Sequence, residues 1–133
     1  MRLIKIIFIL SFINSLAYAD KDMKIGSKGN LNDVNRVVKV VMYDNYYEPS
    51  SLIVKAGETI KFELVNAGEL VHEFNIANKM MHMKHQPEME KMVENEILFA
   101  DSIDKNKMKK MAKIDKSMGH SHSNSVLLEP KQK

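Results

Sequence analysis

The segment from Leu70 to His85 is dense in side chains that bind metal ions. Its sequence, LVHEFNIANKMMHMKH, holds three of the five histidines and three of the eleven methionines of this 133-residue chain. Imidazole nitrogens bind copper in either oxidation state, and thioether sulfurs are soft donors that favour Cu(I). The residue types therefore point to copper chemistry.

Five of these donors fall within six residues, at Met80, Met81, His82, Met83 and His85. As a loop, the segment could wrap around an ion. As a helix, it would place Met81 and His85 on one face at a spacing of four residues, and His82 and His85 at a spacing of three. Thioethers need no deprotonation to bind, so such a site loses less affinity at low pH than a histidine-only site. We interpret these five residues, together with His72, as candidate metal ligands.

The alternative is that methionine fills gaps in a helical packing surface, as it often does. We favour packing for four other methionines, which have helical spacing and Glu or Lys neighbours: Met89, Met92, Met108 and Met111. His120 and His122 form an x-His-x-His element that can bind Cu(II) or Ni(II) loosely. They are weaker metal candidates, and a flexible polar loop is the favoured interpretation there.

The first nineteen residues have the pattern of a secretory signal. Arg2 and Lys5 precede an apolar stretch, and Ala17-Tyr18-Ala19 fits the small-x-small cleavage pattern. The apolar stretch is too short to span a bilayer, which needs about 20 residues. We predict cleavage after Ala19, a periplasmic or secreted product, and no transmembrane span after cleavage. Residues 20–35 are polar and are predicted to be a flexible leader.

Composition argues against several classes of function. Removing Arg2 and Lys5 from the 20 basic side chains leaves 18, against 17 acidic ones, so net charge does not support nucleic-acid binding. The chain has no Cys, so it cannot form the disulfides that exported proteins often use. No nucleophile paired with a base, phosphate-binding glycine loop or HExxH motif is present, and we expect no enzymatic activity.

Residues 36–77 read as a succession of short strands. Val-rich residues from Arg36 predict one strand, and Leu52 to Val54 predict another. The stretch from Thr59 to Asn66 alternates apolar and polar residues, as a half-buried strand does, and Val71 to Ile76 is a further apolar run. Short strands separated by Gly and Pro turns indicate a mainly β fold, a sandwich or a barrel.

Residues 78–119 change in character, being rich in the helix-forming residues Met, Lys and Glu. We predict one helix that begins at Pro87 and runs to about Asn95, and a second from about Ser102 to Ser117. The lysines of this region are interpreted as a solvated helix face. Residues 120–133 are expected to be a loop followed by the start of an incomplete strand and turn, with the strand at Val126 to Leu128.

The order of motifs in the β region resembles the N-terminal half of a cupredoxin, the plastocyanin and azurin type of copper protein. The resemblance covers about 40 residues and is carried by four stretches: Tyr47-Glu48-Pro49, Leu52 to Thr59, Asn66-Ala67-Gly68 and Val71-His72-Glu73-Phe74. The exported bacterial members with a Met- and His-rich insertion after the first histidine are the most similar, and His85, Met89 and Met92 fit that pattern. The resemblance implies a partial Greek-key β-sandwich with a helical Met- and Lys-rich insertion.

The resemblance also implies that His72 corresponds to the first copper ligand of the family. The other family ligands are a Cys, a second His and usually a Met on a later loop. Because the chain has no Cys, a type 1 blue site cannot form from it alone. We therefore expect a cupredoxin truncated before that loop, which at most binds or buffers Cu(I) or Cu(II) through His72 and the segment from Met80 to His85.

The resemblance implies one of three kinds of partner: a redox partner, a copper-handling protein, or the missing C-terminal half. A non-metal exported interaction module, or a non-functional fragment of a split gene, is the alternative to a copper-binding protein.

Overall fold

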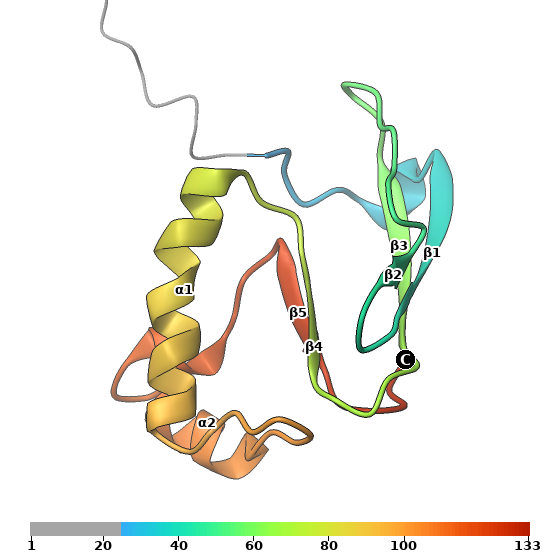
Figure 1. The fold of residues 1–133 in the computed structure, drawn as a ribbon. Helices are drawn as coiled ribbons and strands as arrows, with labels where there is room; N and C mark the ends of the chain where they lie inside the picture. Colours follow the sequence, from blue (N-terminus) through green and yellow to red (C-terminus); the bar gives the residue numbers. More distant parts are fainter. Residues whose placement is uncertain (1–24) are drawn as a thin grey trace, which may run out of the picture.

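The computed structural model describes residues 25–133 (Figure 1). The predicted signal peptide at 1–19 lies outside the described residues, as does the beginning of the leader. Residues 25–35 are mostly exposed and contain the short 3-10 helix η2 (Leu31–Asp33), which the Asn30 side chain caps. Among the described residues, none of the helices combines the length and the apolar character needed to cross a membrane.

A three-stranded sheet forms one layer of the molecule. It contains β1 (Arg36–Met42), β2 (Tyr47–Glu48) and β3 (Ile60–Asn66), in the order β2-β1-β3. β1 is antiparallel to β2 and parallel to β3. The strands predicted from Arg36 onward and over residues 59–66 are therefore confirmed, and they lie side by side.

A second sheet joins residues that are far apart in the sequence. It consists of β4 (His72–Asn75) and β5 (Ser125–Leu128), which are antiparallel, with Glu73 opposite Leu127. β5 confirms the strand predicted near the end of the chain. The fold is mainly β, as predicted, with two sheets in the described region.

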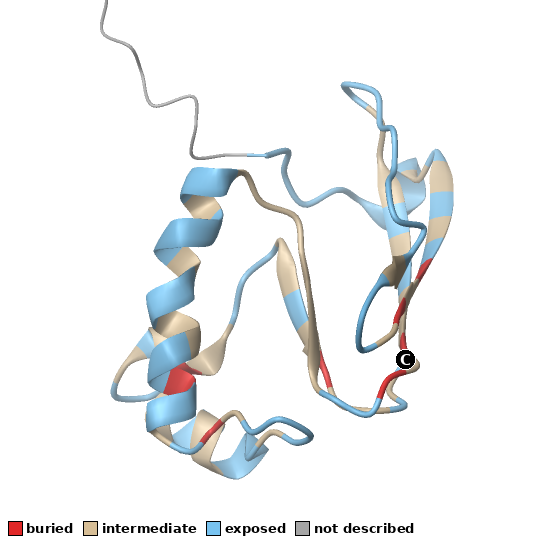
Figure 2. Cartoon of the chain, in the orientation of Figure 1, coloured by how far each residue is buried: buried red, intermediate tan, exposed pale blue. Residues whose placement is uncertain are grey.

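The first of two hydrophobic cores lies where the two sheets meet. Val40 and Met42 of β1 and Leu128 of β5 are buried there, close to the end of the three-stranded sheet (Figure 2). The Phe62 ring of β3 lies 5.1 Å, between centroids, from the Phe74 ring of β4. Alternation along each strand puts these apolar side chains on the facing surfaces of the two sheets, so their burial fixes how the sheets stack.

The other face of the β4–β5 sheet is covered by helices. α1 (Lys79–Glu94) runs beside this sheet, and α2 (Lys105–Met111) and the 3-10 helix η3 (Lys116–Gly119) follow it (Figure 1). Met92 of α1, Ile97 and Met118 of η3 form the second core. Met89, Met108 and Met111 pack against it. The packing interpretation of these methionines is therefore confirmed.

The start of α1 differs from the prediction. The helix begins at Lys79, eight residues before Pro87, which lies inside it. The Asn78 side chain accepts a hydrogen bond from the Met81 amide at 2.8 Å and so caps the helix earlier. The run from Lys79 to Gln86 contains good helix formers, which compensate for the backbone hydrogen bond that Pro87 cannot donate.

The second predicted helix, from Ser102 to Ser117, is divided. Asp104 caps α2 by accepting from the Lys107 amide at 2.8 Å, and the helix ends at Met111. η3 follows after a turn, and the Asp115 side chain accepts from the Ser117 amide. Aspartate is favoured at helix N-caps and disfavoured in helix interiors. Because Asp104 and Asp115 each cap the start of a new helix, the predicted single helix is divided in two.

The prediction of a strand at Leu52 to Val54 is wrong. These residues form no strand and are exposed, with Ile53 88% exposed. The adjacent β2 contains only Tyr47 and Glu48, and a cis peptide bond joins Glu48 to Pro49 directly after it. Local β propensity is weak where no neighbouring strand supplies hydrogen bonds and packing.

Candidate metal centre

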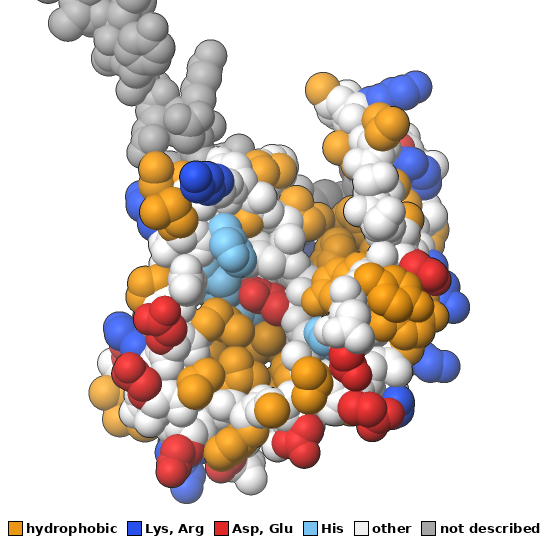
Figure 3. Space-filling model, in the orientation of Figure 1, with side chains coloured by type: hydrophobic (Ala, Val, Ile, Leu, Met, Phe, Trp, Pro, Cys, Tyr) orange, Lys and Arg blue, Asp and Glu red, His pale blue; other side chains and the backbone are white. Residues whose placement is uncertain are grey.

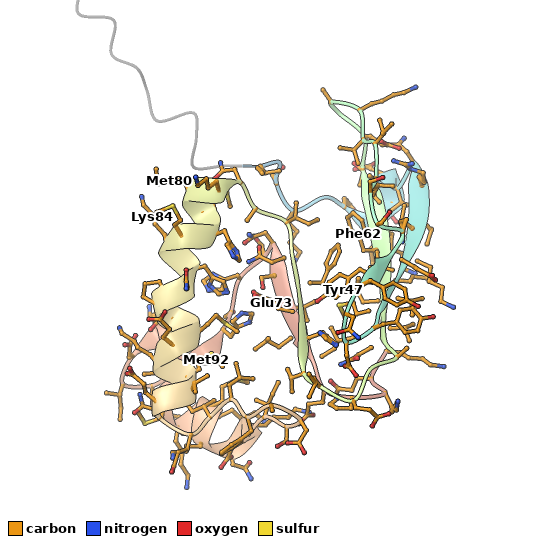
Figure 4. All side chains as sticks on the ribbon, in the orientation of Figure 1. Tyr47, Phe62, Glu73, Met80, Lys84 and Met92 are labelled. Atoms are coloured by element: carbon orange, nitrogen blue, oxygen red, sulfur yellow. The ribbon has the colours of Figure 1, made fainter. Side chains whose placement is uncertain are left out.

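β4 has two chemically different faces because successive side chains of a strand point in opposite directions. His72 and Phe74 face the three-stranded sheet, and Phe74 packs in the first core. Glu73 points toward α1 (Figure 4). The β4–β5 sheet therefore separates His72 from the histidines on its other side.

His72 is held by an acidic residue. Its Nε2 atom lies 3.0 Å from Oδ1 of Asp44, and its ring contacts Tyr47 edge to face. The Asp44 carboxylate also accepts from the amides of Glu69 and Leu70. The Glu69 amide and the His72 ring are the two main causes that lower the pKa of Asp44. A carboxylate that fixes one ring nitrogen is the usual support of a metal-binding histidine.

Gly68 makes this arrangement possible. A Cβ atom at this position would lie 2.1 Å from Oδ1 of Asp44 and 2.9 Å from Nε2 of His72. Any larger residue would collide with the pair, so the Asn66-Ala67-Gly68 turn needs glycine at its third position.

On the opposite face, three side chains from distant segments converge. Oε1 of Glu73 lies 2.8 Å from Nε2 of His85 and 3.2 Å from Nε2 of His120, and the two nitrogens are 3.2 Å apart. The His85 and His120 side chains are only 10% and 4% exposed. In Figure 3, histidine surface lies next to acidic surface between α1 and the β4–β5 sheet. We call Glu73, His85 and His120 the central cluster.

Each member of the central cluster is placed by a different element. β4 carries Glu73, and α1 carries His85 in its second turn. His120 caps η3 in the left-handed conformation, with φ of 44°, which is uncommon outside glycine. Ser125 of β5 donates a short hydrogen bond to Oε1 of Glu73. The centre therefore depends on the packing of α1, η3 and the β4–β5 sheet.

Glu73 is ionised at neutral pH. Burial alone would raise its pKa, but hydrogen bonds from His120, Ser125 and His85, together with the charge of His85, lower the pKa to about 2. The half-buried carboxylate therefore carries a negative charge that can attract a cation.

His85 lies between two carboxylates. Its Nε2 faces Glu73, and its Nδ1 lies 3.1 Å from Oε2 of Glu88, one helical turn further along α1. A neutral imidazole carries a proton on only one nitrogen, so its other lone pair would face a carboxylate. A cation removes this conflict, either as a second proton on the ring or as a metal ion at Nε2.

The central cluster fits a metal ion. Ligand atoms bonded at about 2.0 Å lie about 2.8 Å apart at right angles and about 3.3 Å apart at tetrahedral angles. The three separations within the central cluster, 2.8, 3.2 and 3.2 Å, lie in this range. Imidazole nitrogens with a carboxylate oxygen suit borderline divalent ions such as Cu(II) and Zn(II), and Cu(II) binds most tightly to such donors.

A second group of donors adjoins the first. His122 places its Nε2 2.8 Å from Oε2 of Glu88, and its ring centroid lies 4.9 Å from that of His85. An open cavity of about 200 Å³ is lined by these side chains and by Met81. We call His85, Glu88 and His122 the outer cluster.

The predicted Met/His segment is not brought together as one ligand set. Because Met80 to His85 form part of α1, their side chains are distributed around the helix. Met80, His82 and Met83 are exposed, and Met80 points away from the sheet in Figure 4. Met81 and His85 line the same cavity, as the helical alternative anticipates.

The candidate ligands predicted from the sequence do not include Glu73, Glu88 or Ser125. Glu88 follows His85 by three residues, a helical spacing that could have indicated it. Glu73 and Ser125 give no such local signal, because they meet His85 and His120 only through the pairing of β4 with β5. The weaker candidates, His120 and His122, contact α1.

The sheets, the motifs of the β region and the histidines define a class of protein. The chain belongs to the cupredoxin-like domain family, whose model matches residues 5–102. The chain is similar to the copper-resistant cuproprotein CopI of Pseudomonas aeruginosa, with 40% identity over 111 residues, which are 79% of this chain and 61% of that protein.

A second relative carries the same name. The chain is 34% identical to the copper-resistant cuproprotein CopI of Rubrivivax gelatinosus over 74 residues, which are 55% of this chain and 45% of that protein. The matches thus cover less than two thirds of the length of either relative. No solved structure matches the chain. Because the chain has no Cys, it cannot itself supply the thiolate of a trigonal His₂Cys copper site.

Proposed function

We propose that this protein is an exported copper-binding protein that holds copper at the central cluster of Glu73, His85 and His120. The observation that carries the proposal is the convergence of two imidazole nitrogens on one ionised carboxylate oxygen within 3.2 Å. Membership of the cupredoxin-like family and the names of the relatives support copper as the metal. The signal pattern of residues 1–19 supports export.

Copper binding or buffering is the activity proposed, rather than electron transfer through a type 1 site. The ligand set lacks a thiolate and combines imidazole with a hard carboxylate, which favours Cu(II). His72, oriented by Asp44 on the other face of the sheet, is proposed as a separate copper-binding histidine when further ligands come from outside the chain. A copper-handling protein, a redox partner or a cupredoxin C-terminal half would be the partner.

Copper is expected to stabilise the folded protein, because the central cluster forms only when α1, η3 and the β4–β5 sheet are packed together. Free Cu(II) at 100 times its Kd should stabilise the fold by about 2.7 kcal/mol and raise Tm by roughly 10 °C. Thermal unfolding followed by circular dichroism, with and without Cu(II), measures this shift. Mg²⁺ serves as the control ion, because it prefers oxygen ligands and retains its waters.

An unchanged Tm at saturating Cu(II) would contradict the proposal and favour a non-metal exported module. A shift that persists in a variant carrying both His85→Ala and His120→Ala would place the copper elsewhere in the protein.

The affinity of the protein for Cu(I) is expected to depend on Met81 more than on Met83. Met81 lines the cavity next to His85, whereas Met83 is exposed. Met81→Leu removes a soft donor from that cavity and keeps a good helix former, and it should weaken Cu(I) binding about 10-fold, or about 1.4 kcal/mol. Competition with a Cu(I) chelator under anaerobic conditions measures the affinity.

Met83→Leu is the matched control and should leave Cu(I) affinity unchanged. Equal losses in the two variants would show that the thioethers bind as a flexible set, independently of the cavity.

A further inference from the structure

His85 connects the central and outer clusters through its two ring nitrogens. Nε2 lies at the central cluster, 2.8 Å from Glu73. Nδ1 lies 3.1 Å from Glu88, whose Oε2 is also 2.8 Å from Nε2 of His122. The ligand atoms of His85, Glu88 and His122 all lie within 4.8 Å of one another.

The outer cluster contains more groups than are needed to orient His85 at the first ion. A ligand histidine needs only one acceptor at its second nitrogen, and Glu88 alone provides it. His122 adds an imidazole that contributes nothing to that hydrogen bond. Its ring packs edge to face against those of both His85 and His120, and the cavity leaves open space beside it.

We propose that the outer cluster is a second copper site and that the His85 ring, as an imidazolate, bridges two Cu(II) ions. This inference rests on the proposed function, because the first ion is the one at Glu73, His85 and His120. Glu88 and His122 complete the ligand set at Nδ1. With metal–nitrogen bonds of about 2 Å on each side of the ring, the two ions lie about 6 Å apart.

Charge and proton counts agree with this arrangement. The first Cu(II) takes the lone pair of Nε2, and the second takes the place of the proton on Nδ1, which is released to solvent. Two divalent ions carry four positive charges. The imidazolate and the carboxylates of Glu73 and Glu88 carry three negative charges, so the assembled pair is almost neutral in a half-buried position.

The test is the copper stoichiometry and electron paramagnetic resonance spectrum of the purified protein with Cu(II) as the probe. Equilibrium dialysis should give two Cu(II) per chain. Because an imidazolate couples the two electron spins, the spectrum should show spin–spin coupling and a half-field signal.

Variants of the outer cluster separate the two sites. His122→Ala and Glu88→Gln should each bind one Cu(II) and show an uncoupled spectrum. His82→Ala and Glu90→Gln are matched controls, because both residues are exposed on α1, and these variants should retain two coupled ions.

Four results would overturn the inference. One Cu(II) per wild-type chain would mean that Glu88 only orients His85, and it would leave the proposed function standing. Two uncoupled ions, or two ions that persist in both outer-cluster variants, would place the second ion away from His85. No bound Cu(II) at all would overturn the proposed function as well.

Discussion

Replacing His85 with alanine is expected to cause the largest loss of copper binding of any single substitution in this chain. His85 contacts both Glu73 and Glu88, so its removal takes a nitrogen from the central cluster and from the outer cluster. Loss of a partner that only orients a ligand typically costs 10- to 100-fold in metal affinity. Loss of the ligand itself should therefore lower the Cu(II) affinity by about 100-fold or more.

The measurement is competition with a Cu(II) chelator of known affinity. His85→Ala should remain folded, because Glu73 still accepts hydrogen bonds from His120 and Ser125, and far-ultraviolet circular dichroism checks this. His82→Ala, three residues earlier on α1 and exposed, is the matched control and should bind Cu(II) as the wild type does. Equal affinities for the wild type and the His85 variant would refute the central cluster as the copper site.

Met92→Ala is expected to give a large loss of stability. The Met92 side chain is fully buried in the second core, together with Ile97 and Met118. Truncating a buried methionine removes apolar burial and leaves a cavity, at a typical cost of about 2 to 5 kcal/mol. Since small domains are stable by only about 5 to 15 kcal/mol, this is a substantial fraction of the total. Urea unfolding followed by circular dichroism measures the change.

Two further variants test the packing role of Met92 against a ligand role. Met92→Leu keeps the volume, so it should cost less than about 1.5 kcal/mol and leave Cu(II) affinity unchanged. Val93→Ala, at the next position but exposed, should change stability by about 0.5 kcal/mol or less. A loss of copper affinity in Met92→Leu without loss of stability would instead identify Met92 as a ligand.

Met92→Ala should also weaken copper binding, since the second core holds α1 against η3. His85 and His120 lie on these two elements, and their nitrogens must remain about 3 Å apart to share an ion. The two predictions are therefore linked, but in one direction only: loss of the core impairs the site, whereas loss of His85 leaves the core intact.

Helix boundaries were less predictable than strands. The alternation over residues 59–66 predicted β3 correctly, because burial on one face produces a strong period of two. Proline is favoured at the first turn of a helix, so the sequence predicts that this helix begins at Pro87. Asn78, nine residues before Pro87, caps the helix instead, and α1 tolerates the proline in its interior.

The sequence by itself determined the family, the mainly β fold and the residue types available for copper. These properties depend on local patterns: turn motifs around Gly57 and Gly68, the period of two in β3, and the density of His and Met after His72. The sequence also contains no Cys, and this alone excludes a type 1 site formed by this chain.

Only the tertiary structure decided which donors meet. Sequence proximity grouped His72 with Met80 to His85, but strand alternation turns His72 to one face of β4 and Glu73 to the other. The pairing of β4 with β5 and the packing of η3 then bring His120, 35 residues from His85, to within 3.2 Å of it. Contacts of this kind depend on burial between distant segments, and no local pattern encodes them.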